Sequence, residues 1–207
     1  LHEIYSGSHY NDRPVVQMLE NQFGLLKNEG VMYLRDFAMP MNGEYVLMEM
    51  PDVASRGTGL DDLSEADLLV WYSEHARPRQ DPGCTGFFLE ELPPRFPKTR
   101  LFRLPSKWAY EFIMRKDERE LWDAELPKEY TFFSEREYRK TLRGLGGRVL
   151  YTAPHWDDQL IKARFEGHFR LFEEDGTPLG TPPTSFIAIA QKIGDRISLR
   201  LNERRPS

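Results

Sequence analysis

Cysteine is almost absent from this 207-residue sequence, which contains only Cys84. A single thiol can form neither an intrachain disulfide nor a metal site built from several cysteines. Proteins of oxidising compartments often carry paired cysteines, and none are present here. We therefore expect the protein to be cytoplasmic.

Long apolar runs are also missing. No stretch approaches the roughly 20 consecutive apolar residues that a helix needs to cross a bilayer. Residues 1–5 lack the basic-then-apolar order of a signal peptide. The composition, 40% apolar and 29% charged, is typical of a globular chain, and the length suits one domain or one domain with an insertion. We expect no membrane partner.

Positive charge is not in excess. The sequence has 28 Lys and Arg against 33 Asp and Glu, a formal net charge of −5, which argues against a protein that coats DNA. Residues 95–103 mix basic with aromatic and aliphatic side chains. Such a segment could contact a phosphate backbone, or it could be an extended segment with one solvated face. Nucleic acid is therefore an unexpected partner, and an RNA-handling enzyme stays a third alternative.

Several common catalytic motifs are missing as well. No glycine-rich loop joins a predicted strand to the start of a helix, and neither a Walker loop, a G-x-S-x-G elbow nor an H-E-x-x-H pair occurs. The glycines at 144, 146 and 147 follow a predicted helix, where they terminate it and cannot present free N–H groups to a phosphate. These absences exclude the nucleotide-hydrolase, α/β-hydrolase and zincin motifs from this sequence.

What is present predicts alternating helices and strands. Apolar spacings of three and four, with capping residues, predict helices over residues 12–29, 64–75, 106–121 and 134–147. Short apolar runs predict strands over 31–37, 148–152 and 185–192. The fold class we expect is α/β, with parallel strands and covering helices, and with a large, mostly helical insertion over residues 38–130. In such folds ligands bind beyond the carboxyl ends of the strands, which directs attention to residues 34–37 and 151–156.

A family resemblance adds to this reading. Leu1-His2-Glu3-Ile4-Tyr5-Ser6, the helix after it and Gly30-Val31-Met32-Tyr33-Leu34-Arg35-Asp36-Phe37 resemble the second half of class I S-adenosylmethionine-dependent methyltransferases. Residues 134–147, 148–153 and 184–192 look like the last helix and the terminal antiparallel strand pair of that fold. Four further segments are similar to a bacterial subset of unknown substrate: Lys107-Trp108-Ala109-Tyr110-Glu111-Phe112, Arg115-Lys116-Asp117, Trp122-Asp123-Ala124-Glu125-Leu126 and Tyr151-Thr152-Ala153-Pro154-His155-Trp156.

The resemblance implies a Rossmann-like methyltransferase core, its carboxyl-terminal half, made by residues 1–37 and 131–207. Residues 38–130 would be a lid or an acceptor-binding subdomain. It also implies methyl transfer from S-adenosylmethionine to an unidentified acceptor. The glycine-rich loop and acidic residue that hold this cofactor in the family are not in the sequence. We therefore expect the chain to be a fragment, one half of an enzyme completed by a second chain, or a degenerate relative kept as a non-catalytic binding module.

The same resemblance nominates catalytic and cofactor residues near the start of the chain. His2 and Glu3 would lie where the methyl group meets its acceptor, and a histidine there could act as a general base. The pair could instead cap a helix or fray with the terminus. Tyr5 could cover the cofactor or stack on a planar acceptor, or it could be a core residue.

Five further residues are candidates for binding the substrate. Arg35 and Asp36 end a predicted strand, so they could position the substrate or form an ion pair between loops. His155 and Trp156 follow another strand and could line the mouth of a pocket or pack beneath the next segment. Trp108 could contribute to an acceptor pocket or fill the core. No metal is expected, since His155 and the two aspartates beside it cannot converge on one ion without other ligands.

Overall fold

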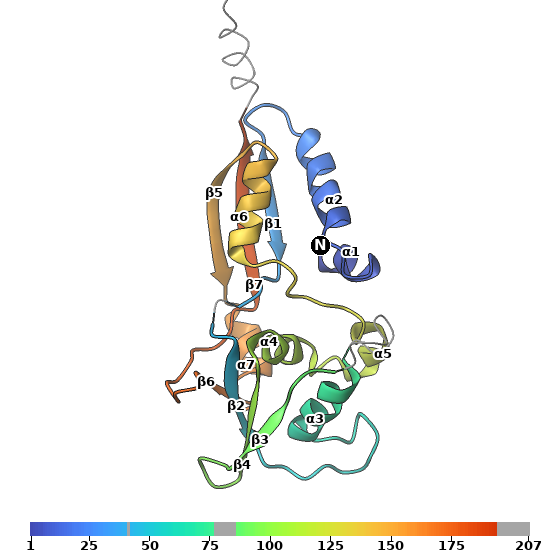
Figure 1. The fold of residues 1–207 in the computed structure, drawn as a ribbon, viewed down its shortest axis with the longest axis vertical. Coiled ribbons are helices and arrows are strands. Elements are labelled where there is room, and N and C mark those ends of the chain that lie inside the picture. Colours follow the sequence, from blue (N-terminus) through green and yellow to red (C-terminus); the bar gives the residue numbers. More distant parts are fainter. Residues whose placement is uncertain (41, 77–85, 194–207) are drawn as a thin grey trace, which may run out of the picture.

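Two separate antiparallel sheets organise the structure (Figure 1). The computed structural model describes residues 1–40, 42–76 and 86–193. Its elements, in chain order, are α1 (His2–Gly7), α2 (Arg13–Gly24), β1 (Val31–Asp36), β2 (Tyr45–Pro51), α3 (Glu65–His75), β3 (Glu90–Leu92), β4 (Thr99–Pro105), α4 (Ser106–Arg115), η1 (Arg119–Leu121), α5 (Trp122–Glu125), α6 (Glu135–Gly144), β5 (Gly147–His155), α7 (Asp158–Arg164), β6 (Arg170–Phe172) and β7 (Ser185–Lys192).

The three-stranded sheet has the order β1-β7-β5. The central strand, β7, runs antiparallel to both neighbours, so β1 and β5 point in the same direction. Met32 pairs with Ala190 on one side of β7, and Thr152 pairs with Ala188 on the other. The predicted antiparallel pairing of residues 148–153 with 184–192 is thus confirmed. A bulge between Val149 and Tyr151 shifts the register within β5.

Helices α2 and α6 cover one face of this sheet, and the face alternation of the strands explains why. Buried residues of α2, α6 and the strands form one apolar cluster: Val15, Leu19, Phe23, Met32, Tyr138, Leu142, Phe186, Ala188 and Ala190, with Phe132 and Phe133 beside them. Ser134 and Glu137 form a capping box that begins α6. The opposite face is open, since Tyr33 and Tyr151 remain 58% and 51% exposed.

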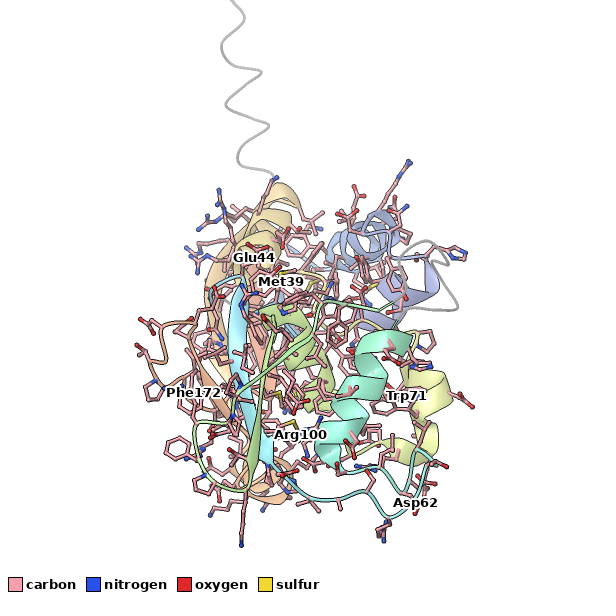
Figure 2. The ribbon with its side chains drawn as sticks, turned by 60° about the horizontal axis from the view of Figure 1, so that its bottom comes forward. Met39, Glu44, Asp62, Trp71, Arg100 and Phe172 are labelled. Atoms are coloured by element: carbon pink, nitrogen blue, oxygen red, sulfur yellow. The ribbon has the colours of Figure 1, made fainter. Side chains whose placement is uncertain are left out.

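The four-stranded sheet has the order β3-β4-β2-β6, and all its pairings are antiparallel. Its inner face packs against α3 and α4 in the larger core cluster, which includes Met48, Met50, Leu68, Leu69, Tyr72, Phe102, Leu104, Phe112 and Ile113. β4 leads directly into α4, so this sheet and that helix are built from one continuous segment. Figure 2 shows the molecule with α3 in front, and it labels Trp71 of α3 and Arg100 of β4.

A buried ion pair in α4 holds the connection between α5 and α6. Glu111 and Arg115 are both 0% exposed and pair one helical turn apart. Glu111 Oε1 accepts hydrogen bonds from the backbone N and the Oγ1 of Thr131, at 2.7 and 2.6 Å. Arg115 donates to the carbonyl oxygens of Glu125 and Lys128, both at 2.9 Å. Every charge is satisfied internally, so these residues of the methyltransferase-like motifs have a structural role here.

The predicted fold class is wrong. The expected α/β sheet would have parallel strands, whereas both sheets here are antiparallel and the fold is α+β. The short apolar runs were compatible with buried parallel strands, but periodicity does not specify which strand pairs with which or in what direction. Residues 38–130 also contain three strands of the four-stranded sheet, where mostly helix was expected. The division of the chain into a core and a 38–130 insertion stays a prediction, although β6, from outside that range, pairs with β2.

Membrane-spanning helices were searched for in the described ranges. None of the helices there is both long and apolar enough to cross a bilayer.

Candidate functional site

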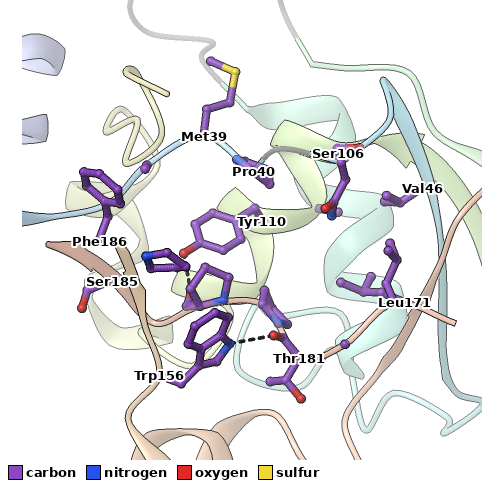
Figure 3. Close-up of a pocket in the computed structure, with 18 of the residues that line it drawn as sticks. Met39, Pro40, Val46, Ser106, Tyr110, Trp156, Leu171, Thr181, Ser185 and Phe186 are labelled. Carbon is purple, nitrogen blue, oxygen red and sulfur yellow. Dashed lines mark hydrogen bonds between the residues drawn. The ribbon is translucent and has the colours of Figure 1, made fainter. Parts of the chain in front are cut away.

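A cavity of about 320 Å³ lies between the two sheets. Its wall comes from the chain just after β1, from the start of α4, from the end of β5 and from the residues that lead into β7 (Figure 3). It therefore opens where β1 and β5 end, as the sequence predicts for residues near 34–37 and 151–156. Trp156 is one of the lining residues, and Ala38 follows β1 by two positions.

Tyr110 forms the floor beneath the segment that leads into β7. Its ring is 3% exposed, and its hydroxyl donates a hydrogen bond to the carbonyl of Pro183. Burial, and to a lesser extent the charge of Glu111, raises the pKa of Tyr110 above the usual range. The hydroxyl therefore stays protonated at neutral pH and fixes Pro183 in the wall.

Trp156 forms one side of the mouth. Its Nε1 donates to the carbonyl oxygen of Thr181 at 2.9 Å, and this bond joins the wall after β5 to the wall before β7 (Figure 3). The side chain stays 47% exposed even though one edge of the indole is hydrogen-bonded. A fixed and accessible aromatic face at a cavity mouth suits stacking on a ligand.

Glu135 contributes the carboxylate of the wall. It is the first residue of α6, and its Oε1 accepts a hydrogen bond from Thr152 Oγ1 at 2.7 Å. Arg139, one turn along the helix, lies 3.5 Å from the same oxygen. The side chain is about one-third exposed, so solvent screens this pair. Its proximity to the cavity gives the site a negative edge.

His2 and Asp36 form a pair beside this cavity. Asp36 ends β1 and is 8% exposed, and its Oδ1 lies 2.6 Å from His2 Nδ1. Its Oδ2 accepts the backbone N–H of His2 at 3.1 Å, and Phe37 N donates to Oδ1 at 2.9 Å. Two residues span at most about 7 Å of chain, so Asp36 lies close to Ala38 of the wall. Neither His2 nor Asp36 is itself a lining residue.

The electrostatics of this pair favour a proton acceptor. Burial alone would raise the pKa of Asp36, but the hydrogen bond and charge of His2 and the amino group of Leu1 hold it below its usual value. Asp36 is therefore a carboxylate at neutral pH and accepts from Nδ1–H of His2. In the neutral ring this leaves the lone pair on Nε2. Phe37 and Tyr130 contact the ring edge-on, with centroids 5.3 and 5.2 Å away, and fix its orientation.

Glu3 and Tyr5, the other two residues nominated near the start of the chain, contact different partners. Glu3 pairs with Lys128 at 2.9 Å, and its Oε1 lies 3.7 Å from His2 Nε2. Tyr5 stacks on Phe132 at 4.9 Å, at the margin of the core.

The remaining three candidates for substrate binding differ in how near they lie to the cavity. Arg35 Nε donates to Ser185 Oγ, a lining residue, at 3.1 Å. Trp108 stacks on Phe87 at 5.1 Å and is not a lining residue. His155 accepts from Thr184 through its backbone carbonyl and is not a lining residue either.

Sequence reasoning missed one important part of the wall. Glu135 stood out only as part of a helix start, whereas Tyr110 belongs with Trp108 to an aromatic-rich stretch that could form an acceptor pocket or a subunit interface, or fill the core. The consecutive prolines 182 and 183, which cannot continue a strand, were an available signal for a shaped segment before β7. Nothing local indicates that this segment meets the first turns of α4.

The described residues do not form a complete S-adenosylmethionine site. Glycines with positive φ are Gly86, Gly146, Gly167 and Gly176, and within the described ranges none of them joins a strand to the start of a helix. The residues present therefore do not fit the cofactor-binding loop that the methyltransferase resemblance implies.

A search for groups of three or more metal-ligating side chains, restricted to residues that the structure describes, finds none. Asp157, next to His155 and Trp156, instead caps α7 by accepting from the backbone N of Gln159 and Leu160 at 3.0 and 3.1 Å.

Carboxylates neutralise much of the basic segment at 95–103. Arg100 pairs with Asp67 at 2.6 Å and with Glu91 at 2.8 Å, and Arg103 pairs with Glu174 at 2.6 Å (Figure 2). Paired cations displace fewer counterions from a nucleic acid, so this surface offers little to a phosphate backbone.

Comparison of the chain with protein-family models, with curated protein sequences and with solved structures finds no match. The methyltransferase resemblance therefore stays a prediction.

Proposed function

We propose that this chain binds a small acceptor molecule in the cavity and accepts a proton from it at His2, as part of an S-adenosylmethionine-dependent methyl transfer. The observation that carries the proposal is the His2–Asp36 pair. Asp36 is the last residue of β1, and Ala38, two residues further along the chain, belongs to the cavity wall. In this proposal the contribution of this chain is to bind, orient and deprotonate the acceptor.

The geometry of the pair suits general base catalysis. Asp36 fixes the tautomer that leaves Nε2 free to accept, and it stabilises the imidazolium that forms when the proton arrives. The two aromatic contacts hold the ring in place, which limits the entropy lost on reaching the reactive arrangement.

The cavity suits a small molecule. It is lined mainly by apolar side chains with few polar groups, the composition that small-molecule sites commonly have. The family resemblance alone supplies the reaction type.

Methyl transfer to a panel of small acceptors tests the proposal. The chain is assayed with labelled S-adenosylmethionine, both alone and as the product of the whole reading frame that encodes it. We expect His2→Asn to reduce transfer by about 10²- to 10⁴-fold, the range that general base catalysis contributes. His9→Asn is the matched control, because His9 is exposed and has a positive φ that Asn tolerates. Equal activity of the two variants would remove His2 from the mechanism.

A second candidate function is a binding module that works as the partner of another chain. The open face of the three-stranded sheet favours it, because Tyr33, Tyr151 and Val31 are at least half exposed there. S-adenosylhomocysteine titrated by calorimetry separates the candidates. Heat of binding with the whole reading-frame product supports the transferase, and its absence from both proteins favours the module.

A further inference from the structure

The wall of the cavity carries charge of one sign. Within the described residues, the lining includes the carboxylate-bearing Glu135 and contains no Lys, Arg or His. The nearest cations lie outside the lining and are already partnered: Arg139 lies 3.5 Å from Glu135 Oε1, and Arg35 donates to Ser185 Oγ. An anionic ligand would lose its hydration and find no cation in the lining itself, which is a costly arrangement. A cationic ligand would find the Glu135 carboxylate, whose Oε1 already accepts a neutral hydroxyl from Thr152.

Two of the hydroxyl donors in this wall are already used. The hydroxyls of Tyr110 and Ser106 donate to the carbonyls of Pro183 and Gly43, so their protons are used while their oxygens can still accept. Four prolines line the cavity, and proline has a carbonyl but no N–H: Pro40, Pro154, Pro182 and Pro183. The side chains of Asn42 and Thr181 are neutral donors in the lining. The site therefore suits a ligand that donates hydrogen bonds.

Trp156 adds an aromatic face at the mouth. Its Nε1 is bound to Thr181, which holds the indole in place, and the side chain is 47% exposed. A cation over an indole is attracted by the ring quadrupole, by about 0.5–1 kcal/mol at exposed sites and more when desolvated. The apolar residues deeper in the wall, such as Val46 and Leu171, suit a hydrocarbon body.

We propose that the acceptor is a hydrophobic primary or secondary amine that binds as its ammonium ion. The ammonium lies by Glu135 and Trp156, and the apolar body fills the cavity. This inference rests on the proposed function for the role of the amine as acceptor. Loss of one proton gives a neutral amine with a free lone pair. Under the proposed function that proton passes to Nε2 of His2, which lies outside the lining, and forms an imidazolium paired with Asp36. Carboxylates and phosphate esters of the same size are rejected.

Three probes of nearly equal shape test the charge preference: 2-phenylethylamine, 2-phenylethanol and phenylacetate. Each is titrated into the unmodified chain by calorimetry, without any cofactor. We expect the amine to bind at least tenfold more tightly than phenylacetate, with the alcohol between them. Glu135→Gln should weaken amine binding by about tenfold and leave alcohol binding unchanged, because the amide keeps the shape but loses the charge. Glu120→Gln is the matched control on the exposed surface of η1.

The test has outcomes that overturn the inference. The inference is wrong if phenylacetate binds as tightly as the amine. It is also wrong if Glu135→Gln weakens the binding of amine and alcohol equally, or if no probe binds at about 10 mM. Thermal unfolding of the variants confirms that each one folds. Binding is measured without transfer, so failure here leaves the role of His2 open. Conversely, the expected binding order combined with unaltered transfer by His2→Asn overturns the proposed function and leaves the cavity preference standing.

Discussion

At the scale of single residues, Asp36 is the most consequential side chain. It accepts hydrogen bonds from three groups, and it connects the end of β1 to α1 through His2. The family resemblance nominated His2, and its position at the end of a predicted strand nominated Asp36. What they could not supply was the pairing, because residues 34 positions apart come together only through the fold.

The depressed pKa of Asp36 predicts a dependence of stability on pH. Its unperturbed value is 3.8, and His2 holds the folded-state pKa below that despite burial. The resulting stabilisation is therefore fully present well above pH 3.8 and is lost as the pH falls through the lower folded-state value. We expect the free energy of unfolding of wild type to exceed that of Asp36→Asn by more at pH 7 than at pH 3. Urea unfolding of both proteins at pH 7 and at pH 3 measures this difference in the free energy of unfolding. The same difference at both pH values contradicts the prediction.

At the scale of elements, local signals predicted α6 and its surroundings well. The capping box at Ser134, the glycines after the helix and the apolar run of β7 each act within a few residues, so the sequence indicates them directly. The direction in which strands pair, by contrast, is not indicated by such local signals. β1 pairs with a strand more than 150 residues further along, and neither periodicity nor turn chemistry encodes that choice. The cavity wall depends on the same long-range pairings, which is why the sequence did not indicate Glu135 as part of it.

Two glycines at the end of α6 predict opposite responses to alanine. A Cβ on Gly147 would lie 2.7 Å from the carbonyl oxygen of Leu142 and 3.1 Å from the ring of Phe23, so the backbone must shift. A Cβ on Gly144 would meet nothing within 4 Å. We expect Gly147→Ala to destabilise the fold by about 1–3 kcal/mol, and Gly144→Ala to be neutral or to stabilise it by up to about 1 kcal/mol. Chemical denaturation of both variants measures this difference, and similar values for the two would contradict the packing argument.

At the scale of the whole molecule, the two sheets bury their inner faces in two separate apolar clusters. The outer face of the three-stranded sheet does not share in this burial, and its tyrosines remain exposed. An apolar dye such as anilinonaphthalene sulfonate should bind to that face.

Replacing Tyr33 and Tyr151 together by Thr tests whether the dye binds to the outer face of the three-stranded sheet. Both side chains are more than half exposed, so we expect the free energy of unfolding to change by less than about 0.5 kcal/mol per site. Threonine keeps the preference for strand, and dye fluorescence should fall. A matched change on the covered face, Met32→Thr, should instead destabilise the fold strongly, because Met32 is 7% exposed. Unchanged fluorescence in the double variant would place the dye elsewhere.

The position of the cavity between the sheets has a thermodynamic consequence. Its wall takes residues from both apolar clusters, among them Phe186 of one and Val46 of the other. A compound bound there stabilises the folded state, in which the two clusters meet. This stabilisation is about 2.7 kcal/mol when the ligand concentration is a hundred times its dissociation constant. Saturation would therefore sharpen the melting transition as well as raise its midpoint, since the clusters would then unfold as a single cooperative unit.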